Sequence, residues 1–179
     1  PLLKKKGISH PDQALALFSS VRRNHMAKAA LETALWDLQA KIEGVPLSTL
    51  IGGGMEAIPA GVVVGNPNLP EALKQIEGYL EQGFKRVKVK ISPEDDIQYI
   101  SEIRKQFPDL PLMADANSAY SLEDMDRLKA LDQFGLLMIE QPLGFDDIID
   151  HAKLQKQIET PICLDESIVT FEDSRKAIE

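Results

Sequence analysis

Residues 86–115, RVKVKISPEDDIQYISEIRKQFPDLPLMAD, contain the pattern on which the fold class of this chain depends. Residues Arg86 to Ile91 predict a strand, and the residues from about Pro93 to Phe107 predict an amphipathic helix. The apolar residues Pro111 to Ala114 predict a second, short strand. Apolar strands separated by a covering helix are typical of a parallel sheet, so this stretch indicates one strand–helix unit of an α/β fold.

The same unit recurs on both sides of this stretch. Further strands are expected at 58–64, 136–139 and 161–164, and further helices at 70–82, 121–131, 146–158 and from 171 onward. Ser92 and Ser121 are expected to cap the helices that follow them. Five units of about 25 residues each fit either a TIM-type barrel or a doubly wound sheet. Before them, residues 1–54 predict helices at about 11–18 and 24–42, the second ended by Gly44.

Composition excludes several classes of function. The net charge of −8 argues against a nucleic-acid backbone or an anionic membrane as the main partner. No apolar run approaches the roughly 20 residues that a membrane-spanning helix needs. Cys163 is the single cysteine, which favours a reducing cytoplasm. The chain does not begin with Met, and we expect it to be a fragment of a longer protein.

Three acidic residues follow three successive strands. Asp115, Glu140 and Asp165 are separated by 25 residues each, and each comes directly after an apolar run. Because the carboxyl ends of neighbouring parallel strands lie side by side, we expect the three carboxylates to converge. Carboxylates held this close repel one another unless a hard cation neutralises them, and Mg²⁺ or Mn²⁺ suits an all-oxygen set. The alternative is that each acid only caps the next helix.

Two lysines lie on one face of the strand before Asp115. Lys88 and Lys90 are two residues apart, so they point the same way. If Val87 and Val89 face the helices, the lysines face the barrel interior. Like charges side by side, next to a metal, lower the pKa of a lysine toward a value useful for a base. The alternative is a solvated pair on an edge strand.

A softer set of residues surrounds these two groups. Asn117, Glu166 and Gln141 are placed to contact substrate or to support the metal ligands. The histidines fall on expected helices or loops away from the strand ends, and we expect them at the surface with no metal role: His10, His25 and His151.

Four short motifs carry a resemblance to a known family: Lys-Val-Lys at 88–90, Met-Ala-Asp-Ala-Asn at 113–117, Ile-Glu-Gln-Pro at 139–142 and Leu-Asp-Glu-Ser at 164–167. Together they resemble the muconate-lactonizing subgroup of the enolase superfamily. Residues 26–50 and 138–168 are similar to the o-succinylbenzoate synthase / N-acylamino acid racemase family within that subgroup.

The resemblance implies a capping domain followed by a modified (β/α)₇β barrel. Residues 1–54 would be the C-terminal helical part of the cap, and residues 55–179 the first five βα units, a partial TIM-type barrel. A second lysine on a sixth strand would then lie beyond Glu179. We therefore expect the isolated chain to be inactive and the full-length protein to be active.

The resemblance also implies a reaction. Mg²⁺ on Asp115, Glu140 and Asp165 would bind the carboxylate of a small substrate, and Lys90 would take or return the adjacent proton while Lys88 tunes it. In o-succinylbenzoate synthase, water is then lost, a step of menaquinone biosynthesis. In an N-acylamino acid racemase or dipeptide epimerase, the proton returns on the opposite face. A non-catalytic metal-binding barrel fragment is the alternative of another class, and a homo-oligomer stays open.

Overall fold

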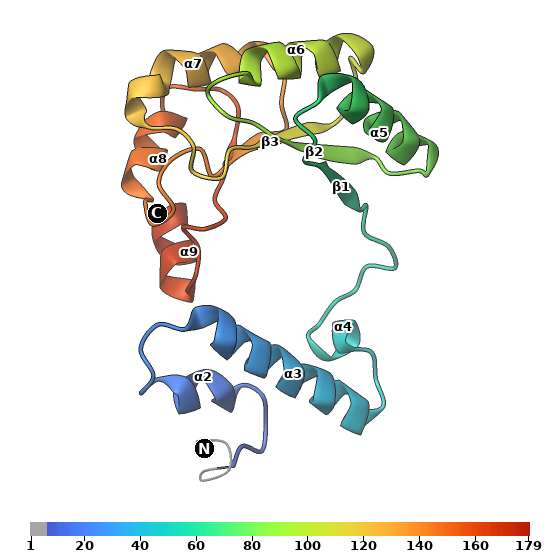
Figure 1. Ribbon diagram of the computed structural model, residues 1–179. Coiled ribbons are helices and arrows are strands. Elements are labelled where there is room, and N and C mark those ends of the chain that lie inside the picture. Colours follow the sequence, from blue (N-terminus) through green and yellow to red (C-terminus); the bar gives the residue numbers. More distant parts are fainter. Residues whose placement is uncertain (1–6) are drawn as a thin grey trace. The chain divides into compact units, whose positions relative to one another are not determined.

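The computed structural model describes residues 7–179 (Figure 1). The chain divides into two compact units, with the boundary between Ile58 and Pro59. No helix of the described residues is long and apolar enough to cross a bilayer.

The first unit is helical, as its sequence predicts. It contains α2 (Gln13–Phe18), α3 (His25–Glu43) and the short α4 (Leu47–Leu50). Helix α3 ends at Gly44, whose φ of 68° is the left-handed conformation that glycine adopts at little cost. Helix α4 was not predicted, because four residues are too few for a periodic pattern to appear.

The second unit is built on a parallel sheet. Its strands are β1 (Gly61–Val64), β2 (Arg86–Lys90), β3 (Leu112–Asp115), β4 (Met138–Glu140) and β5 (Ile162–Cys163). Every pair is parallel and the order is β1-β2-β3-β4-β5. A doubly wound sheet reverses its strand order at a switch point, whereas a barrel adds strands in sequence. The order therefore favours the barrel over the doubly wound sheet.

Helices cover one face of this sheet (Figure 1). They are α5 (Leu69–Glu81), α6 (Asp96–Gln106), α7 (Met125–Ala130), α8 (Ile149–Gln155) and α9 (Phe171–Ile178), with 3₁₀ turns at Leu122–Asp124 and Leu131–Phe134. Strand residues such as Val87 and Val89 pack against helix residues such as Ile76 and Ile100, and all four are fully buried. The apolar core thus lies between sheet and helices, which leaves the opposite face of the sheet for polar groups.

The two expected helix caps have different outcomes. Ser121 forms a capping box with Asp124, which confirms its prediction. Ser92 does not cap α6, so that prediction was wrong. The N–H groups of Asp95 and Asp96 donate to the Ser92 carbonyl at 3.4 and 3.2 Å, and this turn delays the helix until Asp96.

Candidate functional site

The register of the sheet places three predicted residues side by side. Lys90 on β2 pairs with Asp115 on β3, and Asp115 pairs with Glu140 on β4. The carboxylates are buried, with Asp115 only 2% and Glu140 only 7% exposed. The 25-residue repeat therefore brings Asp115 and Glu140 together at the carboxyl ends of their strands, as expected.

The two lysines lie on the sheet face opposite the helices. Val87 and Val89 are buried in the core, while the alternate side chains of Lys88 and Lys90 reach the carboxylates. Lys88 Nζ lies 2.8 Å from an oxygen of Glu140 and 3.3 Å from Asp115 Oδ2. Lys90 Nζ lies 3.2 Å from Asp115 Oδ2. Two cations and two anions thus form one cluster.

The pKa of Lys88 is raised by its carboxylate neighbours. Burial of the ammonium lowers its pKa, but the hydrogen bond to Glu140 and the negative charge of Asp115 together raise it above its ordinary value of 10.5. Both carboxylates contact the ammonium directly, so they stabilise its charged form more than burial penalises it. Lys88 is therefore a fixed positive charge.

Asp165 differs from the other two acids. Strand β5 ends at Cys163, and Glu140 pairs with Cys163 instead of Asp165. Asp165 lies two residues beyond this pair and is exposed. Within residues 7–179, no three His, Cys, Asp or Glu side chains are arranged to hold a metal ion. Asp165 as the third ligand stays a prediction.

Asn117 connects the lysine face to Glu166. Its Oδ1 accepts a hydrogen bond from Lys90, its backbone N–H donates to Asp115 Oδ1 at 3.2 Å, and its Nδ2 donates to Glu166 Oε1 at 3.4 Å. The other Glu166 oxygen is buried and has no hydrogen-bond partner in the described part of the chain. Asn117 adopts a φ of 42°, in the left-handed region that asparagine tolerates better than most non-glycine residues.

Gln141 is fully buried, and its amide contacts protein groups. Its Oε1 accepts from the N–H of Asp165 at 2.9 Å and of Ser167 at 3.3 Å. Its Nε2 donates to Ser167 Oγ at 2.7 Å and to the Gly144 carbonyl at 3.0 Å. Of the two roles expected for Gln141, this geometry fits support of the loop after β5.

One histidine contradicts its prediction. His151 is 3% exposed, whereas His25 is exposed as expected and His10 is half-buried against Trp36. Burial holds the pKa of His151 below its ordinary value of 6.5. Its spacing from Leu154, one helical turn later on the buried face of α8, is the signal that could have revealed it.

A second buried group also escaped the sequence analysis. Asp96 is fully buried and accepts from the Tyr120 hydroxyl at 2.6 Å and from Arg127 Nε at 2.9 Å. Burial and the Asp96 hydrogen bond raise the pKa of Tyr120. This network ties the start of α6 to the loop after β3 that contains Asn117. Acidic residues are common in the first turn of a helix, so the local sequence does not indicate that Asp96 is buried.

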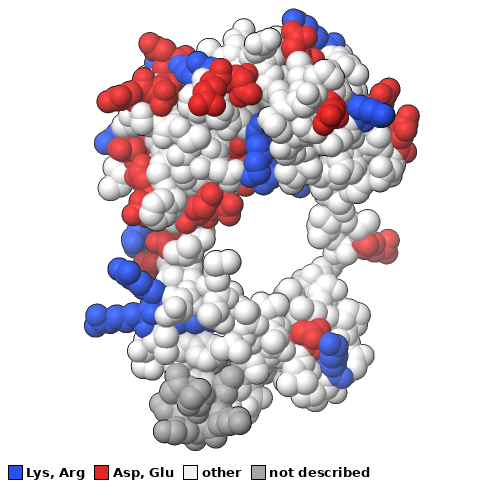
Figure 2. Space-filling model, in the orientation of Figure 1, with Lys and Arg blue, Asp and Glu red and all other residues white. Residues whose placement is uncertain are grey.

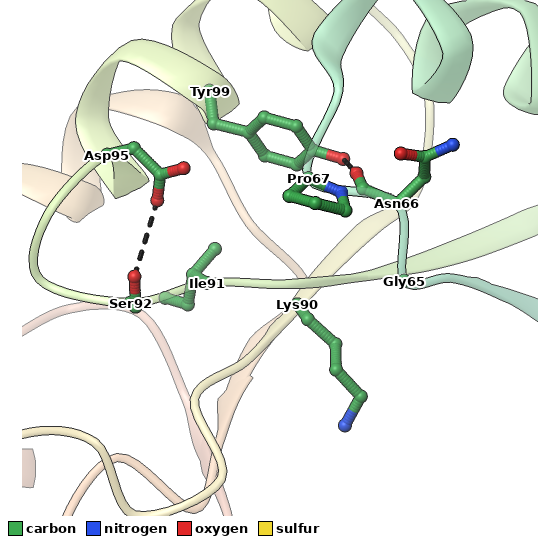
Figure 3. Close-up of a pocket in the computed structure, with 8 residues that line it drawn as sticks. All are labelled: Gly65, Asn66, Pro67, Lys90, Ile91, Ser92, Asp95 and Tyr99. Carbon is green, nitrogen blue, oxygen red and sulfur yellow. Dashed lines mark hydrogen bonds between the residues drawn. The ribbon is translucent and has the colours of Figure 1, made fainter.

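Two cavities lie beside the cluster. One of about 250 Å³ is lined by Lys88 and Glu140, together with residues of β1. The other, of about 180 Å³, lies between the loops after β1 and β2, where the Tyr99 hydroxyl donates to the Asn66 carbonyl at 2.7 Å. Lys90 lines it but directs its ammonium away from Tyr99 (Figure 3). The first cavity therefore faces the carboxylates.

Acidic side chains are numerous on the visible face of the second unit. Figure 2 shows Asp and Glu side chains scattered over the visible face of the second unit, in agreement with the net charge of −8. Within the cluster, the two lysines balance the charges of Asp115 and Glu140.

Comparison with known families gives two matches. Residues 71–179 match a model described as Enolase C-terminal domain-like. Residues 5–52 match a model described as Mandelate racemase / muconate lactonizing enzyme, N-terminal domain.

Curated relatives carry two different names. The chain is 57% identical over its whole length to an o-succinylbenzoate synthase of Geobacillus stearothermophilus, of which it covers 48%. It is 45% identical over its whole length to an N-succinylamino acid racemase of Thermus thermophilus, of which it covers 49%. The chain thus spans about half the length of the curated relatives it matches.

Solved structures share the fold. An enolase-superfamily member from Listeria innocua superposes with a TM-score of 0.92 at 49% identity, covering 99% of this chain and 48% of that one. The L-talarate/galactarate dehydratase of Salmonella typhimurium, liganded with Mg and L-lyxarohydroxamate, gives a TM-score of 0.82 at 31% identity, covering 94% and 46%.

Proposed function

Because this chain belongs to the enolase superfamily, we propose that it contributes the metal-binding and proton-abstracting side of an active site that acts next to a substrate carboxylate. The observation that supports this most is the pairing of Lys88 and Lys90 with Asp115 and Glu140 across three strands. Two solvent-exposed lysines on an edge strand would not be expected to contact two buried carboxylates.

The two lysines suit different roles. Lys88 is 24% exposed and contacts both carboxylates, which makes it a fixed charge beside the substrate. Lys90 is 49% exposed and contacts one carboxylate, so its amine has room to approach a substrate. We assign Lys90 as the group that takes the proton from the carbon next to the carboxylate, and Lys88 as the charge that tunes it.

The oxygen donors fit a hard divalent cation. Asp115 and Glu140 are buried, and the buried Glu166 Oε2 lacks a partner among the described residues, which is costly unless a cation or water compensates. We propose Asp115, Glu140 and Asp165 as ligands of Mg²⁺, with Mn²⁺ as a substitute. When bound, such a cation would polarise the substrate carboxylate and make the neighbouring C–H more acidic.

We propose that the full-length protein is an o-succinylbenzoate synthase, since relatives of that name reach 57% identity. The substrate is then a small cyclohexadiene carboxylate that loses water, as menaquinone biosynthesis requires. N-acylamino acid racemisation is the second candidate, because the Thermus thermophilus racemase is 45% identical. Both reactions begin with the same proton removal, which is why the site itself does not separate them.

The proposal includes the domain assignment and the cellular context. Residues 1–54 are assigned to the C-terminal helical part of a capping domain, and residues 55–179 to the first five βα units of the barrel. Return of a proton on the opposite face calls for a group opposite Lys90. The chain spans about half of its relatives, so we propose that the 179 residues alone do not turn over substrate. We propose a cytoplasmic location on the basis of the single cysteine.

A chimera tests the proposal. Residues 1–179 replace the matching segment of the Geobacillus stearothermophilus relative, and the product is assayed for dehydration and for racemisation of an N-succinylamino acid. We expect dehydration and, in deuterated water, exchange of the substrate proton. Lys90→Ala should abolish both, whereas Lys74→Ala, at an exposed lysine on α5, should leave both unchanged. Exchange retained by Lys90→Ala would overturn the assignment of the base.

A further inference from the structure

The loop after β5, which contains Asp165 and Glu166, is bound directly by Gln141, the residue after β4, and indirectly by His151 of α8. We propose that Gln141 and His151 are positioning residues that fix this loop against the end of β4 and thereby place the predicted ligand Asp165. The inference rests on the proposed function for the role of Asp165, but its contacts are independent of that role.

Gln141 is the centre of the arrangement. Its carbonyl accepts two backbone N–H groups, from Asp165 at 2.9 Å and from Ser167 at 3.3 Å, while its amide nitrogen donates to Ser167 Oγ at 2.7 Å and to Gly144 O at 3.0 Å. An amide side chain has two acceptor sites and two donor hydrogens, and all four are used. Loss of this side chain would leave the N–H groups of Asp165 and Ser167 without their acceptor, which destabilises this loop.

The backbone of Gln141 points to the same conclusion. Its φ is 40°, in the left-handed region where a residue with a Cβ is strained. Such strain persists only where the surrounding structure compensates for it. The hydrogen bonds of the side chain to the next strand's loop supply that compensation.

His151 holds the loop after β4, whose Asp147 carbonyl in turn binds Ser167 of the loop after β5. Its Nε2 accepts from the Leu143 N–H at 3.0 Å, and its Nδ1–H donates to the Asp147 carbonyl at 2.8 Å. These contacts require the neutral ring with the proton on Nδ1. The Ser167 hydroxyl donates to the same Asp147 carbonyl at 2.8 Å. A continuous path of hydrogen bonds therefore runs from α8 through Ser167 to Gln141 and the N–H of Asp165.

The opposite end of β5 offers a matched control. Asp132 accepts from the Thr160 N–H at 2.8 Å, the Thr160 hydroxyl at 2.7 Å and the Glu159 N–H at 2.9 Å. Like Gln141, it is a side chain from a neighbouring unit that binds backbone N–H groups next to β5. Unlike Gln141, it acts before the strand, away from Asp165.

Amide hydrogen exchange on the 179-residue chain tests the positioning directly. In Gln141→Leu, exchange at Asp165 and Ser167 should accelerate at least tenfold, while the amide of Ile139, which donates to the Pro161 carbonyl, keeps its protection. Asp132→Asn should accelerate Thr160 and leave Asp165 unchanged. His151→Phe should accelerate Leu143 and, to a smaller extent, Ser167. Unchanged exchange at Asp165 and Ser167 in Gln141→Leu would overturn the proposal. If that variant does not fold, Ser167→Ala is measured instead, because it removes the hydrogen bond between Gln141 Nε2 and Ser167 Oγ. Exchange at Asp165 and Ser167 must then accelerate as well, by a smaller factor.

A titration with Mn²⁺ separates this inference from the proposed function. Residues that support metal ligands typically change affinity about 10–100-fold, so Gln141→Leu should weaken Mn²⁺ binding by that factor and Asp132→Asn should not. A wild-type chain that takes up no Mn²⁺ contradicts the proposed metal site, and the exchange measurement then decides the positioning alone. Equal Mn²⁺ affinity in wild type and Gln141→Leu overturns the positioning of Asp165.

Discussion

Asp115 and Asp165 follow apolar strands in the same way, yet the structure holds them differently. Asp115 is 2% exposed, is the last residue of β3 and pairs with a strand on each side. Asp165 is exposed, lies beyond a strand of two residues and is fixed through its backbone by Gln141. The first acid is positioned by the sheet, and the second by side chains that the neighbouring loop supplies.

This difference shows how far a repeat determines a site. Strands β2, β3 and β4 share one register, so the 25-residue spacing places Lys90, Asp115 and Glu140 at one level. At β5 the pairing ends two residues earlier, and a second mechanism, the Gln141 side chain, takes over.

The largest expected effect follows from removing the Lys88 charge that neutralises Asp115 and Glu140. Lys88→Met leaves Asp115 and Glu140 adjacent, with Lys90 as the remaining contact of Asp115. Breaking one partner of a buried ion pair typically costs about 3–5 kcal/mol, so the free energy of unfolding should fall by about 3 kcal/mol. Denaturant titration measures this change, with the exposed Lys74→Met as control. A loss below about 1 kcal/mol would show that the acids do not depend on Lys88.

A smaller effect is expected at the network beside Asn117. Tyr120→Phe removes the hydrogen bond to Asp96 but leaves Arg127 in place. Hydrogen bonds to charged groups contribute about 1.5–3 kcal/mol, so unfolding should become easier by about 2 kcal/mol. Tyr79→Phe, whose ring packs edge-on against Phe84, should change stability by less than about 0.5 kcal/mol. Equal effects of the two substitutions would contradict the role given to Asp96.

The pH dependence of stability tests His151, which belongs to the hydrogen-bond network that reaches Asp165. The folded-state pKa of His151 lies below 6.5, so above pH 6.5 both the folded and unfolded states hold the neutral ring. As pH falls below 6.5, the unfolded state binds a proton that the folded state does not, and stability decreases until the folded-state pKa is reached. His151→Gln should flatten this part of the curve in thermal unfolding between pH 7 and 5, whereas His25→Gln, at an exposed histidine, should not. An unchanged slope in His151→Gln would contradict the buried neutral ring.

Much of the cluster of Lys88, Lys90, Asp115 and Glu140 could be predicted from the sequence. Apolar strands of regular spacing determine which residues lie at the strand ends, and alternation along β2 determines that Lys88 and Lys90 share a face. The offset at Asp165 could not be predicted, since it depends on the register in which β5 pairs with β4. The raised pKa of Lys88 depends on the positions of two oxygens, which local patterns do not give. His151 looked like a surface residue because a single polar side chain on a short helix is ordinary.

The smallest expected effect on folding belongs to Asp165 itself. Because its side chain is exposed, Asp165→Asn should change the free energy of unfolding by less than about 0.5 kcal/mol. Denaturant titration alongside wild type gives the value. A loss above about 2 kcal/mol would mean that the carboxylate, and not the backbone N–H, holds this loop.

The titration of the 179-residue chain with Mn²⁺ is the most direct test that the two differently held acids serve one cation. Wild type should bind the ion, and Asp115→Asn and Asp165→Asn should each weaken binding by more than the roughly 10–100-fold typical of a supporting residue. Binding by Asp165→Asn equal to that of wild type would contradict the assignment of Asp165 and, with it, the three-carboxylate site.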